Sequence, residues 1–435
     1  MKKLFTLLVV FALCGSKYVQ GQSLTDKTVA RQILNDRNLD SIQRNALQLL
    51  KGFSAGTSYN EVWIRDFNTF IRGSLKVRDK QTVKDVLLLF FKIQGDDGNI
   101  VDGLVDTSKA HGGYAYRYSK LLPTWAAHKN TVETDQESSL VQAVKKYIDV
   151  TGDASILTEV IDGKTVMRRM EDAMQYILTD RWSARYQLVK GATTIDWGDV
   201  QPEAGWGVAI NKQTKWSIDI YDNAMFAIAL RDLAEMKPAG YTFQKNWQDI
   251  AAKLKKQVRA HLWSSANNKY IPHLYLNGSP FSGSFDEKAI LYTGGTICAI
   301  MAGFNTPAEI KQILRQFRAA AAKEKYATIG ITVYPPYPLS QFPNMKPYLY
   351  QNAGDWTWFG GRIAEALKPY GLLTDAYRDL KPMLARAIEN KGFYEWYDVQ
   401  TGKPKGSGDF RGEAGVLYDA IDILKLWAKQ VLKEG

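Results

Sequence analysis

Two segments of the chain carry carboxylates in settings suited to acid and base chemistry. In "NTVETDQESSLVQAV", Glu133, Asp135 and Glu137 stand at the start of a helical pattern, and in "NKGFYEWYDVQTGKPKG", Glu395 stands among aromatic residues. Aromatic surroundings desolvate a carboxylate and raise its pKa toward useful values. The pattern favours function at Glu395 over an exposed edge strand, whereas a capping box, with Thr134 as N-cap and Glu137 at N3, accounts slightly better for the first segment.

Three further segments join charged residues to aromatic faces, a combination that suits sugar hydroxyls and rings. They are "WIRDFN", "TTIDWGDVQPE" and "NAGDWTWFGG". The acids are too widely separated for a metal site, so we expect neither a metal ion nor a cofactor. Tyr397, an aromatic neighbour of Glu395, is added to these segments. The predicted carbohydrate-binding residues are then Trp63, Arg65, Asp66, Asp196, Trp197, Asp199, Trp356, Trp358 and Tyr397.

The formal charge of the 435 residues is +11, but the basic residues are spread over helical faces. Because no basic arm or stripe stands out, we expect solvated helix surfaces and no nucleic-acid partner, with an anionic substrate or a charged cell envelope as the less favoured explanation. The only cysteines are Cys14 and Cys298, which predicts no internal disulfide in a processed chain.

The first 21 residues resemble a secretory signal peptide. Two lysines precede an apolar run from Leu4 to Leu13, which is too short to span a bilayer. A lipoprotein anchored through Cys14 is less favoured, because the bulky Leu13 stands where a small residue is required. We therefore expect an exported periplasmic or extracellular protein with no membrane span.

Helical periodicity recurs along the rest of the chain, which predicts an all-α fold. Short connections alternate with long loops rich in Trp, Asp, Gly and Tyr, and such loops usually carry function. This alternation fits a monomer with one domain, residues 22–435, in which six helical hairpins close into an (α/α)6 toroid with its working loops at one end. The predicted helices are 27–52, 66–78, 80–94, 135–150, 154–180, 217–236, 243–263, 287–303, 307–325, 352–369, 373–391 and 411–432.

Taken together, the motifs resemble the (α/α)6-barrel glycosidases, the clan of processing α-glucosidases, trehalases and neutral/alkaline invertases. "WIRDF" is similar to the invertase segment Ile-Arg-Asp-Phe, and "DWTWFGG" is similar to a Trp-x-x-Gly-Gly segment. "TDQESSLVQAVKKYIDVTGD" resembles the segment in which an acidic residue opens a helix that ends in Thr-Gly-Asp. "YEWYDVQTGKPKG" is similar to the region of the general base. The chain departs from invertases at residues 136–140, so their substrate does not transfer.

The resemblance implies an inverting glycoside hydrolase for α-glucosides or related oligosaccharides, with Asp135 as general acid and Glu395 as general base. Asp66 would then cap the helix "FNTFIRGSLKV" and, with Arg65, hold sugar hydroxyls beside the scissile bond. One difficulty is that a helix N-terminus lowers the pKa of Asp135, so burial or repulsion from Glu133 or Glu137 must outweigh it. Alternatives left open are a polysaccharide lyase, an unsaturated-uronyl hydrolase and a carbohydrate-binding protein without catalysis.

Overall fold

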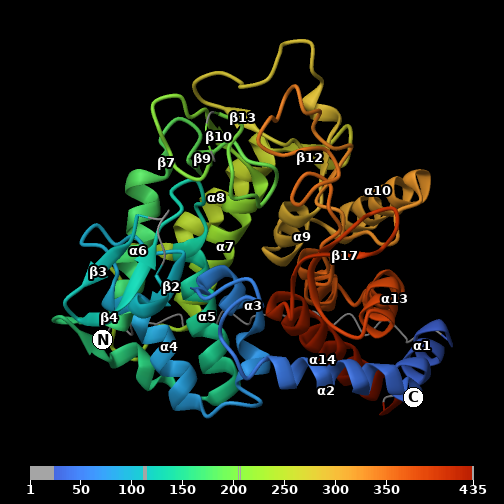
Figure 1. Ribbon diagram of the computed structural model, residues 1–435, viewed down its shortest axis with the longest axis horizontal. Coiled ribbons are helices and arrows are strands. Elements are labelled where there is room, and N and C mark those ends of the chain that lie inside the picture. The colour runs from blue at the N-terminus through green and yellow to red at the C-terminus, as the bar shows by residue number, and fades with distance from the viewer. Residues whose placement is uncertain (1–23, 111–114, 204, 206, 434–435) are drawn as a thin grey trace, which may run out of the picture.

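The computed structural model describes residues 24–110, 115–203, 205 and 207–433, and the prediction of a mainly helical fold is confirmed there (Figure 1). The predicted signal peptide and Cys14 lie outside these residues. No helix in the described ranges is long and apolar enough to cross a membrane. The α-helices are α1 (Leu24–Asn35), α2 (Arg37–Leu49), α3 (Ile64–Ser74), α4 (Lys80–Lys92), α5 (Gln136–Thr151), α6 (Val166–Asp180), α7 (Ile220–Glu235), α8 (Trp247–His261), α9 (Gly294–Met301), α10 (Pro307–Glu324), α11 (Thr357–Gly360), α12 (Ile363–Leu367), α13 (Leu373–Glu389) and α14 (Arg411–Lys433).

Six of these helices pack in a closed series. Helix α3 contacts α5, α5 contacts α7, α7 contacts α9, α9 contacts α12, α12 contacts α14, and α14 returns to α3. Helices α2, α4, α6, α8 and α13 each pack against one or two members of this series. The first and last parts of the chain therefore lie side by side, as the adjacent blue and red helices of Figure 1 show.

Short strands occupy the long connections, which the all-α prediction overlooked. The largest sheet is antiparallel with the order β1-β2-β4-β3, and six smaller sheets accompany it in the described residues. Most strands span only two or three residues, too few for an alternating pattern to stand out. The strands are β1 (Val62–Trp63), β2 (Gly103–Asp106), β3 (Arg117–Ser119), β4 (Leu122–His128), β5 (Val160–Ile161), β6 (Lys164–Thr165), β7 (Trp182–Ser183), β8 (Leu188–Val189), β9 (Gly191–Ala192), β10 (Trp216–Ile218), β11 (Trp263–Ser264), β12 (Lys269–Tyr270), β13 (Leu274–Tyr275), β14 (Leu291–Tyr292), β15 (Val333–Tyr334), β16 (Tyr394–Tyr397) and β17 (Pro404–Gly408).

The predicted helix boundaries hold for most helices. The predicted helix 27–52 is divided into α1 and α2 at Asp36, and three further predicted helices are interrupted or shortened by strands or turns. The predicted helix 154–180 contains the hairpin β5–β6, because Asp162 and Gly163 both have positive φ and form its turn. Thr165 then caps α6 by accepting a hydrogen bond from the amide of Arg168. The predicted helix 287–303 begins only at Gly294, after strand β14, and the predicted helix 352–369 is split into α11 and α12.

Two predicted helix caps are wrong. Helix α3 begins at Ile64 with Trp63 as its N-cap, so Asp66 lies in the first turn and does not cap the helix. Helix α5 has Asp135 as its N-cap residue, without a capping hydrogen bond from the side chain. Glu137 accepts from the amide of Ile100 at 2.8 Å and pairs with Lys129, so it is engaged outside its own helix and makes no capping box.

Candidate active site

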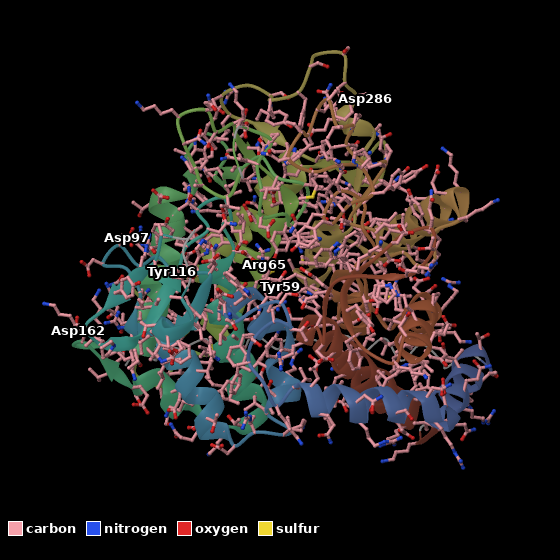
Figure 2. The ribbon with its side chains drawn as sticks, in the orientation of Figure 1. Tyr59, Arg65, Asp97, Tyr116, Asp162 and Asp286 are labelled. Carbon is pink, nitrogen blue, oxygen red and sulfur yellow. The ribbon has the colours of Figure 1, made fainter. Side chains whose placement is uncertain are left out.

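A cavity of about 320 Å³ opens at the end of the packed helices where α3 and α5 begin. Tyr59 and Arg65 mark its position near the centre of the molecule in Figure 2. The loop before α5, the long loops after α6 and before α11, and the hairpin β16–β17 complete its walls. Its acidic residues are Asp66, Asp102, Glu133, Asp199 and Glu395, and its aromatic residues include Tyr59, Trp63, Trp197, Tyr350, Trp356, Trp358 and Phe410.

Glu395 lies on β16 with its carboxylate held by three donors. The hydroxyls of Tyr59 and Tyr350 donate to Oε1 at 2.6 and 2.9 Å, and the amide of Ser407 donates to Oε2 at 2.7 Å. Burial and the Glu395 charge raise the pKa of both tyrosines above their usual range, which keeps them protonated as donors. Glu395 is therefore arranged as a carboxylate with fixed orientation, which suits a base.

Gly406, on the partner strand β17, gives Glu395 its space. Its φ is +68°, and a Cβ atom there would lie 2.4 Å from Glu395 Oε2. Only glycine adopts this conformation at little cost and leaves the carboxylate in place.

Gly406→Ala is therefore expected to lower kcat by at least about tenfold, because even a small misplacement of a catalytic group is costly. Gly402→Ala is a matched control, since Gly402 has a φ of +66° in the same hairpin but nothing within 4 Å of its Cβ position. Both variants carry the backbone strain, and only the first displaces Glu395. Steady-state kinetics and thermal unfolding of the two variants separate the effects. Equal kinetics would show that the contact with Glu395 is unimportant.

Asp135 is fully buried and does not line the cavity. Arg65 donates from Nε to its Oδ2 at 2.7 Å and from Nη2 to its Oδ1 at 2.8 Å, and the Tyr221 hydroxyl donates to Oδ2 at 2.7 Å. Burial alone would raise the pKa of Asp135, but the charge and hydrogen bonds of Arg65 outweigh it and hold that pKa below the ordinary value. This geometry does not fit the proton-donor role expected for Asp135. It fits a positioning role, in which Asp135 fixes the Arg65 guanidinium at the cavity wall.

Loss of either member of this buried ion pair leaves the other uncompensated. Arg65→Met is expected to lower the free energy of unfolding by about 3–5 kcal/mol, measured by urea denaturation. Arg378→Met is the control, because Arg378 pairs with Asp375 at the surface, where such pairs contribute about 1 kcal/mol or less. A loss no larger for Arg65 than for Arg378 would contradict this account.

The stabilisation by Asp135 is present above its ordinary pKa of 3.8 and is lost as the pH falls toward the lower pKa that this group has in the folded protein.

Asp102, Glu133 and Asp199 form an acidic wall of the cavity. Asp102 contacts His128 Nδ1 at 2.9 Å. Glu133 accepts from Gln136 Nε2 at 3.0 Å and lies 3.3 Å from the Arg65 guanidinium. Asp199 is half-buried, interacts with Gln351, and has no ion-pair partner in the described part of the chain.

Glu133 and Asp199 on this wall keep their protons to a higher pH than ordinary carboxyls do. Burial, more than the neighbouring carboxylates, raises the pKa of Glu133 well above its ordinary value, and burial also raises the pKa of Asp199. The charge of Asp199 makes a small contribution to the raised pKa of Glu133. Asp199 has fewer restraints, so it is the member better placed to deliver a proton into the cavity.

The structure gathers most of the predicted substrate-binding residues at this cavity. Asp196 lies outside it, accepting from the amides of Gly294 and Gly295 at 2.7 and 2.8 Å at the start of α9. Tyr397 lies outside it as well, with its hydroxyl on Glu413 and its ring against Arg386. Both residues have structural contacts in place of the predicted sugar contacts. Those that do line the cavity are Trp63, Arg65, Asp66, Trp197, Asp199, Trp356 and Trp358, with Glu395.

The sequence motifs missed several cavity residues. Tyr59 lies four residues before one motif that was singled out and Tyr350 two residues before another, but no local pattern shows that both hydroxyls reach Glu395. The pair of Asp102 and His128 comes from strands β2 and β4 and their flanks, and pairing of these strands was not predicted.

Comparisons with known proteins place the fold among glycoside hydrolases. No family model matches the sequence, and no curated protein sequence matches it. A solved structure of the GH63 mannosylglycerate hydrolase from Thermus thermophilus, in complex with glucose, matches at a TM-score of 0.63 and 16% identity over 87% of this chain and 99% of that chain. A rhamnosidase from Klebsiella oxytoca with rhamnose bound matches at a TM-score of 0.57 and 15% identity, over 88% of this chain and 63% of that chain. A GH78 rhamnosidase of Bacillus sp. GL1 also matches, at a TM-score of 0.55 and 14% identity, over 88% of this chain and 34% of that chain. The expected resemblance to (α/α)6-barrel glycosidases is confirmed at the level of the fold.

Proposed function

We propose that this chain is an inverting glycoside hydrolase on an (α/α)6 barrel, in which the closed series of α3, α5, α7, α9, α12 and α14 is the inner ring. Glu395 is the general base and Asp199, in place of Asp135, is the general acid. The observation that carries the proposal is the position of Glu395, a carboxylate fixed by three donors in a cavity that also holds a protonatable acidic wall.

Glu395 activates the water that attacks the anomeric carbon. A carboxylate has about four acceptor positions, and three of those on Glu395 are occupied by Tyr59, Tyr350 and Ser407. The remaining position accepts a hydrogen bond from water and then its proton. Such a reaction inverts the configuration at the anomeric carbon, because the water attacks from the face opposite the leaving group.

Asp199 gives its proton to the glycosidic oxygen. The charges of Glu395 and Asp199 both contribute to the raised pKa of Tyr350, which supports a position of that hydroxyl between the two carboxyls. A general acid must keep its proton to a higher pH than an ordinary carboxyl does. Burial raises the pKa of Asp199, whereas Arg65 holds the pKa of Asp135 below its ordinary value although burial opposes this. The helix-dipole difficulty expected for Asp135 therefore does not arise.

Arg65 and Asp66 hold the sugar ring that is being transferred. Both line the cavity on the first turn of α3. Burial, with the Glu395 charge adding to it, raises the pKa of Asp66 to about 7, so this carboxyl donates to or accepts from a sugar hydroxyl near neutral pH. Trp63, Trp356 and Trp358 offer apolar faces for the ring.

Neutral α-glucosides or related oligosaccharides are the substrates we propose. Five carboxyl groups line the cavity, and its Arg65 is already paired with Asp135 and Glu133. An acidic sugar would be repelled there, which weighs against the polysaccharide lyase and the uronyl hydrolase. Export through a signal peptide in residues 1–21, and action as a monomer, belong to the same proposal.

A panel of neutral α- and β-linked glycosides, with uronate polymers beside them, tests this assignment. We expect release of a monosaccharide from an α-linked member and no rise in ultraviolet absorbance from the uronate polymers. Sugar binding without turnover on every member would contradict hydrolysis, and an absorbance rise would indicate a lyase.

A further inference from the structure

A second cavity, here called the distal cavity, lies further along the same helices. It has a volume of about 350 Å³ and is bordered by α3, α5, α7, α12 and α14. On α3 its residues Asn68, Thr69 and Arg72 follow Arg65 and Asp66 of the catalytic cavity. Asp149, Arg231 and Glu235 are exposed at its rim, so it opens to solvent.

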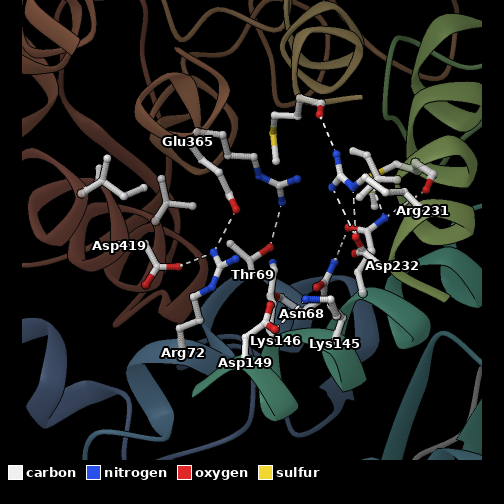
Figure 3. A pocket seen from close by; sticks show the side chains of 18 of the residues that line it. Asn68, Thr69, Arg72, Lys145, Lys146, Asp149, Arg231, Asp232, Glu365 and Asp419 are labelled. Carbon is white, nitrogen blue, oxygen red and sulfur yellow. Dashed lines mark hydrogen bonds and ion pairs between the residues drawn. The ribbon is translucent and has the colours of Figure 1, made fainter. Parts of the chain in front are cut away.

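Most charges in the distal cavity are paired within the protein. Figure 3 shows Arg72 with Glu365 and Asp419 on one side, and Arg231 with Asp232 on the other. Two lining cations, Lys146 and Arg362, have no carboxylate within ion-pair distance among the described residues.

Lys146 is a cation in an unfavourable environment. Its ammonium donates to the carbonyl of Asn68 at 2.7 Å. Burial lowers its pKa to about 8; repulsion from Arg72 and Arg362 adds to the effect, and the charges of Glu365 and Asp419 oppose it. A nearby anion would relieve both contributions.

Arg362 lines the distal cavity as the N-cap residue of α12, and it donates to the Thr69 hydroxyl at 2.8 Å. The pKa of Glu365, three residues after Arg362, is about 2. Burial raises this pKa, but the positive charges of Arg72, Lys146 and Arg362 lower it by more. Lys146 and Arg362 are therefore the two lining cations that no carboxylate of the described residues contacts directly, although Glu365 and Asp419 act on Lys146 from a longer distance. Asn68 Oδ1 is buried beside the distal cavity without a hydrogen bond, and it is available to a hydroxyl donor.

We propose that the distal cavity binds a small molecule through an oxyanion, a phosphate or a carboxylate, held by Lys146 and Arg362, with a hydroxyl of the same molecule donating to Asn68. Ammonium and guanidinium groups are the usual partners of such oxyanions. The site is separate from the catalytic cavity, and its existence does not depend on the proposed hydrolysis.

Isothermal titration calorimetry with inorganic phosphate and, in a second arm, acetate tests this site at low ionic strength, where screening is weak. The arm that binds identifies the head group, and neither anion carries a ring that would fill the catalytic cavity. Lys146→Met is expected to weaken binding by about ten- to a hundredfold, the effect of losing one charged hydrogen bond. Lys253→Met, which removes an exposed lysine on α8, is expected to change nothing. Absence of millimolar binding in both arms, or equal affinity of the two variants, would overturn the proposal.

A second measurement uses the unaltered protein and so does not depend on the folding of a variant. Because its pKa is about 8, Lys146 is expected to react with an amine-directed reagent at pH 8 faster than ordinary lysines. The anion that binds in calorimetry is expected to slow labelling of Lys146 and not of Lys253, as read by peptide mass spectrometry. Equal labelling of Lys146 with and without that anion would contradict the site.

Discussion

Glu395→Gln is expected to lower kcat by about 10²- to 10⁴-fold, the range that general-base catalysis contributes. Glutamine retains the size of the side chain, and its Oε1 can still accept from Tyr59 and Tyr350. It cannot take a proton from water, so substrate affinity is expected to change little while turnover is lost. Single-turnover kinetics, with binding measured separately, distinguish these two effects.

Glu389→Gln is the matched control for this change. Glu389 is the last residue of α13, is exposed, and lies six positions before Glu395, so the same substitution there is expected to leave kcat unaltered. Azide, a nucleophile that needs no deprotonation, is expected to restore bond cleavage in Glu395→Gln. Wild-type turnover in Glu395→Gln would remove this residue from the chemistry.

Asp199→Asn and Asp135→Asn are expected to fail in different ways, and the difference identifies the proton donor. With a poor leaving group, Asp199→Asn should lose about 10²- to 10⁴-fold in kcat. With an activated leaving group such as fluoride or dinitrophenolate, which departs without protonation, most of that loss should disappear. Asp135→Asn should lose activity equally on both substrates, because it disturbs Arg65 and not the proton transfer.

The comparison of the two substrate types decides whether Asp199 or Asp135 is the proton donor. Glu133→Gln is measured on the same two substrates. Glu133 and Asp199 lie on the same wall, and the Asp199 charge acts on Glu133, so Glu133→Gln is expected to shift the alkaline limb of the pH profile more than the rate at its maximum. Selective rescue of Asp135→Asn by the activated substrate would return the acid role to Asp135. Selective rescue of Glu133→Gln would assign that role to Glu133.

The sequence was informative where local periodicity or a local motif determines structure. Amphipathic spacing located nearly all of the long helices, and the aromatic and acidic motifs identified most residues of the cavity. The aromatic surroundings predicted the burial of Glu395, which is only 4% exposed, whereas the hairpin that carries this residue was not predicted.

The role of Asp135 depends on contacts that no local pattern contains. Its ion pair joins it to Arg65, 70 positions earlier, and Tyr221 approaches from 86 positions later. Similarity to a family segment therefore selected Asp135, the residue at the start of α5. The acidic side chains that line the cavity are instead those of Glu133, two residues earlier, and of Asp199 on another loop. Asp196 and Tyr397 were chosen for their types, but their partners on α9 and α14 hold them away from the cavity.

The anomeric configuration of the first product tests the central claim most directly. Once the panel provides a glycoside that is cleaved, proton NMR spectra recorded in the first minutes, before mutarotation, identify the anomer released. With Glu395 activating water opposite the leaving group, we predict that an α-linked substrate releases the β-anomer. Release of the α-anomer would contradict an inverting reaction and the role of Glu395 as its base.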